Sequence, residues 1–261
     1  MAIAQDVISS KDENEEEIFY PISDGKPMAE SDLHQLVMIY CVFALRTHYA
    51  DDPDVYVSGN NFLYYVEGNA RQVVSPDCYV VFGVGSPLRD TYKVWEEGGQ
   101  KPAVVIEITS KSTKNEDMGR KFKKYKQDLK VKEYFLFDPT GDYLQPTLQG
   151  YRLVNGQYVR IPFQTDRLVS EQLGLELVVQ EEDLRFYDPK KGRWMLTPQE
   201  ALDQAEAERQ KADMERQKAE RAQQQAEIER KRADTEANAR QEAEAEIAQL
   251  CAEIEALRKK S

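Results

Sequence analysis

The sequence has few cysteines and no long hydrophobic segment. Its three cysteines, Cys41, Cys78 and Cys251, are far apart and odd in number. We therefore expect neither a disulfide framework nor a cysteine metal site, which fits a reducing compartment. The longest apolar run, residues 36–45, is too short to cross a bilayer, and the acidic start of the chain is not typical of a signal peptide. These features predict a cytoplasmic protein without a membrane segment.

The signatures of several common enzyme classes are also missing. The chain has no glycine-rich phosphate loop, no serine or cysteine nucleophile motif and only two histidines. Its net charge of −12 argues against a surface covered in basic residues for holding nucleic acid. Residues 111–132 nevertheless carry nine Lys or Arg against three acids. We therefore expect a local basic patch on an otherwise acidic protein.

Composition divides the chain into three parts. Residues 1–25 carry seven acids and one base, which predicts an acidic, flexible N-terminal segment. Residues 26–195 are nearly neutral and contain the apolar patterns of a folded domain. Residues 196–261 are dominated by Ala, Glu, Gln, Arg and Lys, which is typical of a long helix.

Within residues 26–195 the apolar pattern changes between helical and strand periodicity. Residues 30–50 have the spacing of a helix with one buried face, and Ser31 is its expected N-cap. Residues 55–84 contain three strand-like runs, and residues 85–102 are expected to form a polar connection. The strand "AVVIEI", the basic helix "KNEDMGRKFKKYKQDLK" and the strand "KEYFLFDP" follow. This order predicts an α/β fold in which helices flank a mixed sheet.

The C-terminal part has a heptad repeat. The phrase "ERQKA" occurs at 208–212 and again at 215–219. Ile247 and Ile254 fall on the same heptad position as a series of alanines, and Leu250 and Leu257 occupy the matching second position. The repeat predicts an α-helical coiled coil that joins two chains in parallel as a homodimer. A single solvated helix is the alternative.

Two acidic residues stand at the ends of predicted strands. Asp77 precedes the strand "CYVVFGV", and Glu107 lies near the end of "AVVIEI". If these strands are neighbours, two carboxylates approach each other, and like charges at that distance need a positive partner. A divalent cation such as Mg²⁺ or Mn²⁺ is the usual solution, because it prefers oxygen ligands. A turn role for Asp77 and a structural ion pair for Glu107 are the alternatives.

The basic helix that follows Glu107 offers further groups for such a site. Asp117, Lys121 and Tyr125 are spaced four residues apart and are expected to share one face. On that face Lys121 would point back to the carboxylates, as a catalytic cation near a metal and a phosphate. The other basic residues of the helix are expected to meet a phosphate backbone.

Taken in order, these pieces resemble a known family. The pattern "SPD", then "VIEITS", then Asp117, Lys121 and Tyr125, then "EYFLFDP" is similar to the Uma-type endonucleases of the PD-(D/E)XK, restriction-endonuclease-like superfamily. The similarity runs from about residue 27 to residue 194. It implies a restriction-endonuclease-like fold and a metal-dependent nuclease that acts on nucleic acid, with DNA as the expected substrate.

The resemblance also assigns roles. Asp77 and Glu107 match the two acids that bind the metal. The superfamily pattern places a lysine two residues after the second acid, where this chain has Thr109, and Lys121 matches the lysine that replaces it in Uma-like sequences. Glu30 and His34 match the place where many members add an acidic or polar group near the metal. Because Thr109 departs from the pattern, a catalytically inactive nuclease fold that works as a coiled-coil scaffold is the alternative function.

Overall fold

The structure is a computed structural model that describes residues 18–23 and 31–258. The chain forms two compact units, Met1–Pro198 and Gln199–Ser261. The first unit contains all the strands, and the second consists of the long helix α4 (Pro198–Arg258) after its first residue. The mixed α/β fold with a long C-terminal helix is therefore confirmed.

The first unit is built around a six-stranded sheet with the order β1-β4-β6-β7-β8-β9. Only β6 and β7 run parallel, and the other neighbours are antiparallel. The central strands β4, β6 and β7 are buried on both faces, which explains why their sequences are almost continuously apolar. The strands of this sheet are β1 (Val55–Ser58), β4 (Cys78–Phe82), β6 (Val104–Ile108), β7 (Glu133–Phe137), β8 (Leu148–Val154) and β9 (Gln157–Arg160).

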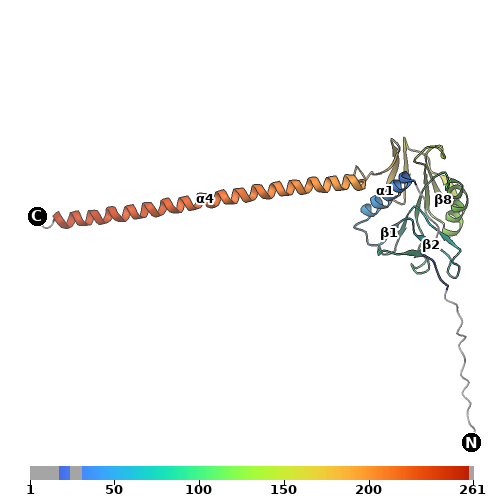
Figure 1. The fold of residues 1–261 in the computed structure, drawn as a ribbon, viewed down its shortest axis with the longest axis horizontal. Coiled ribbons are helices and arrows are strands. Elements are labelled where there is room, and N and C mark those ends of the chain that lie inside the picture. The colour runs from blue at the N-terminus through green and yellow to red at the C-terminus, as the bar shows by residue number, and fades with distance from the viewer. Residues whose placement is uncertain (1–17, 24–30, 259–261) are drawn as a thin grey trace, which may run out of the picture. The chain divides into compact units, whose positions relative to one another are not determined.

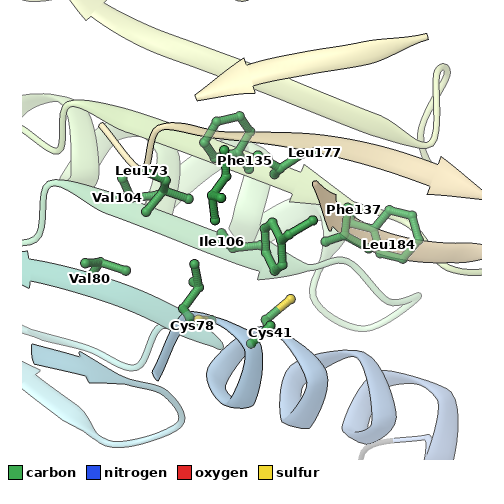
Figure 2. Close-up of a cluster of buried hydrophobic side chains, with 14 of the residues drawn as sticks. Cys41, Cys78, Val80, Val104, Ile106, Phe135, Phe137, Leu173, Leu177 and Leu184 are labelled. Atoms are coloured by element: carbon green, nitrogen blue, oxygen red, sulfur yellow. The ribbon is translucent and has the colours of Figure 1, made fainter. Parts of the chain in front are cut away.

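One face of the sheet is covered by helix α1 (Asp32–His48) and a small four-stranded sheet. Ser31 caps α1 as predicted, because its side chain accepts a hydrogen bond from the backbone N–H of His34. Figure 2 shows Cys41 of α1 and Cys78 of β4 in the same apolar cluster as Ile106 and Phe137. The four-stranded sheet is an antiparallel meander of β10 (Arg167–Ser170), β11 (Leu175–Gln180), β12 (Asp183–Asp188) and β13 (Arg193–Trp194).

The other face packs against the basic helical segment. This segment runs without a break through α2 (Lys114–Glu116), η1 (Asp117–Lys121), α3 (Phe122–Lys124) and η2 (Tyr125–Leu129), and η1 and η2 are π-helical. Tyr125 and Leu129 of the segment are buried against Val105 and Tyr134 of the sheet. Alternate residues of a strand point to opposite faces. Glu107 lies two residues after Val105 in β6, so it also points to the helical segment.

A three-stranded sheet contributes to the apolar cluster on the face of the six-stranded sheet that packs against the helical segment. It consists of β2 (Phe62–Tyr64), β3 (Val73–Val74) and β5 (Thr91–Lys93), with β2 in the middle. Strand β5 falls within residues 85–102, so the prediction of a purely polar connection there was wrong. The central residue of β5, Tyr92, is fully buried and stacks on Tyr56. This buried ring and the parallel pairing with β2 hold the short strand, although the neighbours of Tyr92 within it are polar.

Helix α4 is one unbroken helix of 61 residues (Figure 1). After Pro198 its sequence contains neither Gly nor Pro, so nothing in it interrupts helical hydrogen bonding. Within the described residues, no helix is both long and apolar enough to span a membrane.

Candidate active site

The two carboxylates predicted to meet are brought together by the pairing of β4 with β6. These strands are antiparallel, with Cys78 opposite Ile106. Asp77 therefore lies beside Glu107, and each carboxyl group accepts a hydrogen bond from the backbone of the neighbouring strand's segment. The N–H of Asp77 donates to Glu107 Oε2 over 3.3 Å, and the N–H of Ile108 donates to Asp77 Oδ2 over 2.7 Å. The expectation that these two strands are neighbours is confirmed.

A glycine on the neighbouring loop fixes the position of Asp77. The backbone of Gly59, directly after β1, approaches the Asp77 carbonyl so closely that an added Cβ would lie 2.1 Å from its oxygen. The next residue, Asn60, donates its N–H to the carbonyl of Pro76 over 2.8 Å. The loop therefore leaves little freedom to the peptide that carries Asp77. This contact was not predicted, and the Gly-Asn pair at residues 59 and 60 is its only signal in the sequence.

The helical segment supplies the groups predicted from its spacing. Lys121 Nζ donates to Glu107 Oε2 over 2.9 Å and lies 3.3 Å from Asp117 Oδ1. The hydroxyl of Tyr125 donates to Glu107 Oε1 over 2.6 Å. Both oxygens of Glu107 are therefore engaged by one helical face. A π-helical turn contains more residues than an α-helical turn. Because the segment alternates between the two, residues spaced four apart stay on the same side of it over two turns.

Burial dominates the electrostatics of this cluster. Glu107 is fully buried and Asp117 almost so, and burial raises the pKa of both carboxyls, an effect that Lys121 partly offsets. Burial alone would raise the pKa of Asp77 too, but His34 and Lys121 outweigh it and lower the pKa. Burial likewise would lower the pKa of Lys121, yet the surrounding carboxyls raise it. Lys121 thus stays charged among three carboxyl groups.

Helix α1 adds a histidine to the cluster. His34 lies in its first turn, is buried, and places Nε2 3.4 Å from Asp77 Oδ1. The structure therefore brings His34 to the site, whereas Glu30 lies outside the described residues. The Ser31 cap fixes where the helix begins and so aims His34 at Asp77.

Thr109 occupies the position where the superfamily pattern has lysine. It follows Glu107 by two residues, so it faces the same side of the sheet, and it is buried. Its N–H donates to the carbonyl of Phe137 over 2.7 Å. Its hydroxyl oxygen has no hydrogen-bond partner of good geometry among the described residues. Lys121 reaches Glu107 from the helical segment instead.

A cavity of about 470 Å³ opens beside these groups. Asp77 and Lys121 form part of its lining, while Glu107 and Asp117 are buried. A ligand in the cavity therefore meets one carboxylate and one ammonium of the cluster directly.

Comparison with known proteins identifies the family. The family model Uma2, described as "Putative restriction endonuclease", matches residues 8–182, which is more than half of the chain. The chain belongs to the Uma2 family. The matched residues include the whole Asp77, Glu107 and Lys121 cluster and end before α4. No curated protein matches this member of the Uma2 family.

Several chains of solved structures are similar to this Uma2 chain. One of them is described as "a putative nuclease belonging to DUF820" from Anabaena variabilis ATCC 29413. The two chains are 15% identical, the match covers 57% of this chain and 76% of the other, and the TM-score is 0.41.

The Uma2 family implies a divalent metal, and the residues of this chain fit one by their chemistry. Carboxylate oxygens are the ligands that Mg²⁺ and Mn²⁺ prefer, and the cluster holds three carboxyl groups around one lysine. Neither oxygen of Asp117 has a hydrogen-bond partner of good geometry in the described part of the chain. Across residues 18–23 and 31–258, no group of three His, Cys, Asp or Glu side chains is arranged to hold a metal. In proteins Mg²⁺ is usually bound through one or two carboxylates and completes its coordination with water and phosphate.

Proposed function

We propose that this Uma2-family protein is a metal-dependent endonuclease that hydrolyses phosphodiester bonds in nucleic acid, with DNA as the expected substrate. The observation that carries the proposal is the hydrogen bond from Lys121 to Glu107 beside Asp77. Through it a lysine is present at the site, although Thr109 stands where the superfamily pattern has a lysine. Asp77 and Glu107 would hold Mg²⁺ or Mn²⁺. When bound, such an ion lowers the pKa of a coordinated water and offsets charge on the phosphate.

The chain's own residues would each have a distinct part in this reaction. Lys121 lines the cavity and would face the phosphate with a permanent positive charge. Tyr125 holds one oxygen of Glu107 and leaves the other to Lys121, so it acts as a positioning residue. His34 would orient Asp77 in the same way from α1, and Asp117 would keep Lys121 charged and directed into the cluster.

The proposal is tested by a cleavage assay on single- and double-stranded DNA and RNA with Mg²⁺ or Mn²⁺. The wild-type chain is expected to cut at least one of these substrates, and Asp77→Asn, Glu107→Gln and Lys121→Met are expected to abolish cutting. Lys123→Met is the matched control, because Lys123 carries the same charge on the same segment outside the cavity. A pure, folded protein that binds the metal by calorimetry but cuts nothing would contradict the proposal.

The second candidate function is a nuclease fold without activity that serves as a scaffold. Thr109 favours it, as does the lack of a three-ligand group among the described residues. In that case α4 would be the working part. Metal titration separates the two candidates, because a scaffold need not bind Mg²⁺ or Mn²⁺ in a way that depends on Asp77.

For either function we propose the same domain organisation. Residues 26–195 would form the nuclease domain after an acidic segment 1–25, and residues 196–261 would form a coiled coil that makes the protein a homodimer. The heptad positions of Ile247, Leu250 and Ile254 support pairing, because all three side chains are largely exposed on the single helix. A cytoplasmic location is proposed from the three cysteines, which are all free.

A further inference from the structure

The cavity next to Asp77 and Lys121 extends well beyond the carboxylate cluster. One wall comes from the strands β2 and β3, with Phe62, Tyr64 and Val73 among its residues. Another comes from the basic helical segment. A cavity of about 470 Å³ lies in the size range of pockets that hold a ligand of a few tens of atoms. It is large enough for one nucleotide.

The β2 wall offers a rigid aromatic surface. The rings of Phe62 and Tyr64 meet edge to face, with centroids 6.1 Å apart. Tyr64 is buried, and its hydroxyl donates to the carbonyl of Pro21 over 2.5 Å. Phe62 is only half-buried and lines the cavity. Flat apolar rings of this kind bind nucleobases by stacking, whatever the base.

The helical wall adds positive charge. Arg120 and Lys124 line the cavity together with Lys121, and Glu116, which forms an ion pair with Arg120, lines it too. Lys124 Nζ donates to the carbonyl of Val73 over 3.1 Å and lies 5.5 Å from the centre of the Tyr65 ring. It is therefore held at the edge of β3. The lining thus has three cations against the two carboxyl groups of Asp77 and Glu116, which favours an anionic ligand here although the chain as a whole carries a net charge of −12.

The cavity also has polar groups suited to the edge of a base. Asn60 lines it in a left-handed backbone conformation with φ of 57°. Its backbone is tied to Pro76, so its side chain starts from a fixed point beside Asp77. Amide side chains pair with the donor and acceptor groups of nucleobases.

We propose that this cavity binds one unpaired nucleotide of the strand that is cut, with its base against Phe62 and its phosphate near Arg120 and Lys121. The inference rests on the proposed nuclease function and adds the form of the substrate. A base in an intact duplex is stacked and paired, and must be flipped out before it can enter such a pocket. Single strands, flaps and frayed ends are therefore the preferred substrates.

The test measures binding separately from cleavage. The full chain is titrated into a dye-labelled single-stranded DNA and into a hairpin duplex of the same length, once with EDTA and once with Ca²⁺. Single-stranded DNA is expected to bind at least about tenfold more tightly, in line with the contribution of base stacking on an aromatic side chain. A 2-aminopurine base placed in the strand is expected to lose fluorescence on binding.

Matched variants locate the binding. Phe62→Ala and Arg120→Gln are each expected to weaken single-strand binding about tenfold, and Phe62→Leu, which keeps apolar volume in case the alanine variant misfolds, is expected to lose the 2-aminopurine quenching. Lys123→Gln removes an equal charge from an exposed position outside the cavity and is expected to bind as wild type.

Equal binding of both DNA forms would overturn the inference, as would a loss for Lys123→Gln as large as for Arg120→Gln. Its failure is distinguishable from that of the proposed function. Selective single-strand binding without any cleavage would overturn the nuclease and support the pocket. Cleavage of duplex and single strand at equal rates, unchanged by Phe62→Ala, would support the nuclease and overturn the pocket.

Discussion

Lys121 and Glu107 are joined by a hydrogen bond of 2.9 Å although fourteen residues separate them. The bond links the basic helical segment to a fully buried acid of the central strand β6. Lys121 therefore has two roles. It compensates a buried negative charge, and it presents its own charge to the cavity.

The first prediction separates these two roles of Lys121. Lys121→Met leaves Glu107 buried without its ion-pair partner, which is expected to lower the free energy of unfolding by about 3 kcal/mol. In Lys121→Met with Glu107→Gln the carboxyl of Glu107 is gone while Asp117 keeps its own, so part of that loss is expected to be recovered. Urea denaturation of the wild type, both single variants and the double variant measures this coupling. Simple additivity of the two single losses would contradict it.

Much of the site follows from sequence because its signals are local. The apolar runs predict the strand that begins after Asp77 and the strand that carries Glu107 near its end, and a spacing of four predicts the helical face that carries Lys121. The role of Gly59 was not predictable, because it depends on a contact between loops eighteen residues apart. Strand β5 was missed for a related reason, since it is held by the buried ring of Tyr92 rather than by its own pattern.

The second prediction concerns the contact between Gly59 and Asp77. Gly59→Ala would place a methyl group 2.1 Å from the Asp77 carbonyl oxygen, so the loop or the carbonyl must shift. We expect a loss of about 1–3 kcal/mol in stability, as for overpacked cores, and a weaker metal affinity. Thermal denaturation and calorimetric titration with Mn²⁺ measure the two effects.

Gly119 provides the matched control for this substitution. It lies in the helical segment, and a Cβ there would meet nothing within 4 Å. Gly119→Ala is expected to stabilise the protein by about 0.5–1 kcal/mol, because alanine loses less backbone entropy in a helix. If Gly59→Ala were as well tolerated as Gly119→Ala, the loop would not be what fixes Asp77.

The third prediction concerns Asp138, the buried residue that follows β7. Its carboxylate accepts hydrogen bonds from the backbone N–H groups of Thr140, Gly141, Tyr143 and Leu144. Burial would raise the pKa of Asp138, but these bonds outweigh it and hold the pKa below the ordinary value of 3.8. The unfolded chain therefore takes up the proton first as pH falls. The stabilisation is fully present above the unfolded pKa and is lost as pH falls through the lower, folded pKa.

Asp138→Asn is accordingly expected to cost about 2 kcal/mol at neutral pH, through the weakening of charge-assisted hydrogen bonds. The difference in unfolding free energy between wild type and variant is expected to shrink as the pH is lowered below 4, close to the ordinary aspartate pKa of 3.8. Urea denaturation across this pH range measures it. Asp142→Asn, an exposed change of the same charge, serves as the control and should show no such convergence.

The last prediction tests the pairing of α4. Ile247 and Ile254 are 61% and 52% exposed on the single helix, and both fall on one heptad position, where a parallel partner would bury them. Ile247→Glu with Ile254→Glu is expected to convert a dimer into a monomer, because two charges would enter the seam of each chain. Light scattering after gel filtration gives the mass. Met214→Glu is the matched control, since Met214 is 64% exposed but lies two residues past the seam position Ala212. A wild-type chain that is already monomeric, or a control that also dissociates, would rule out this seam.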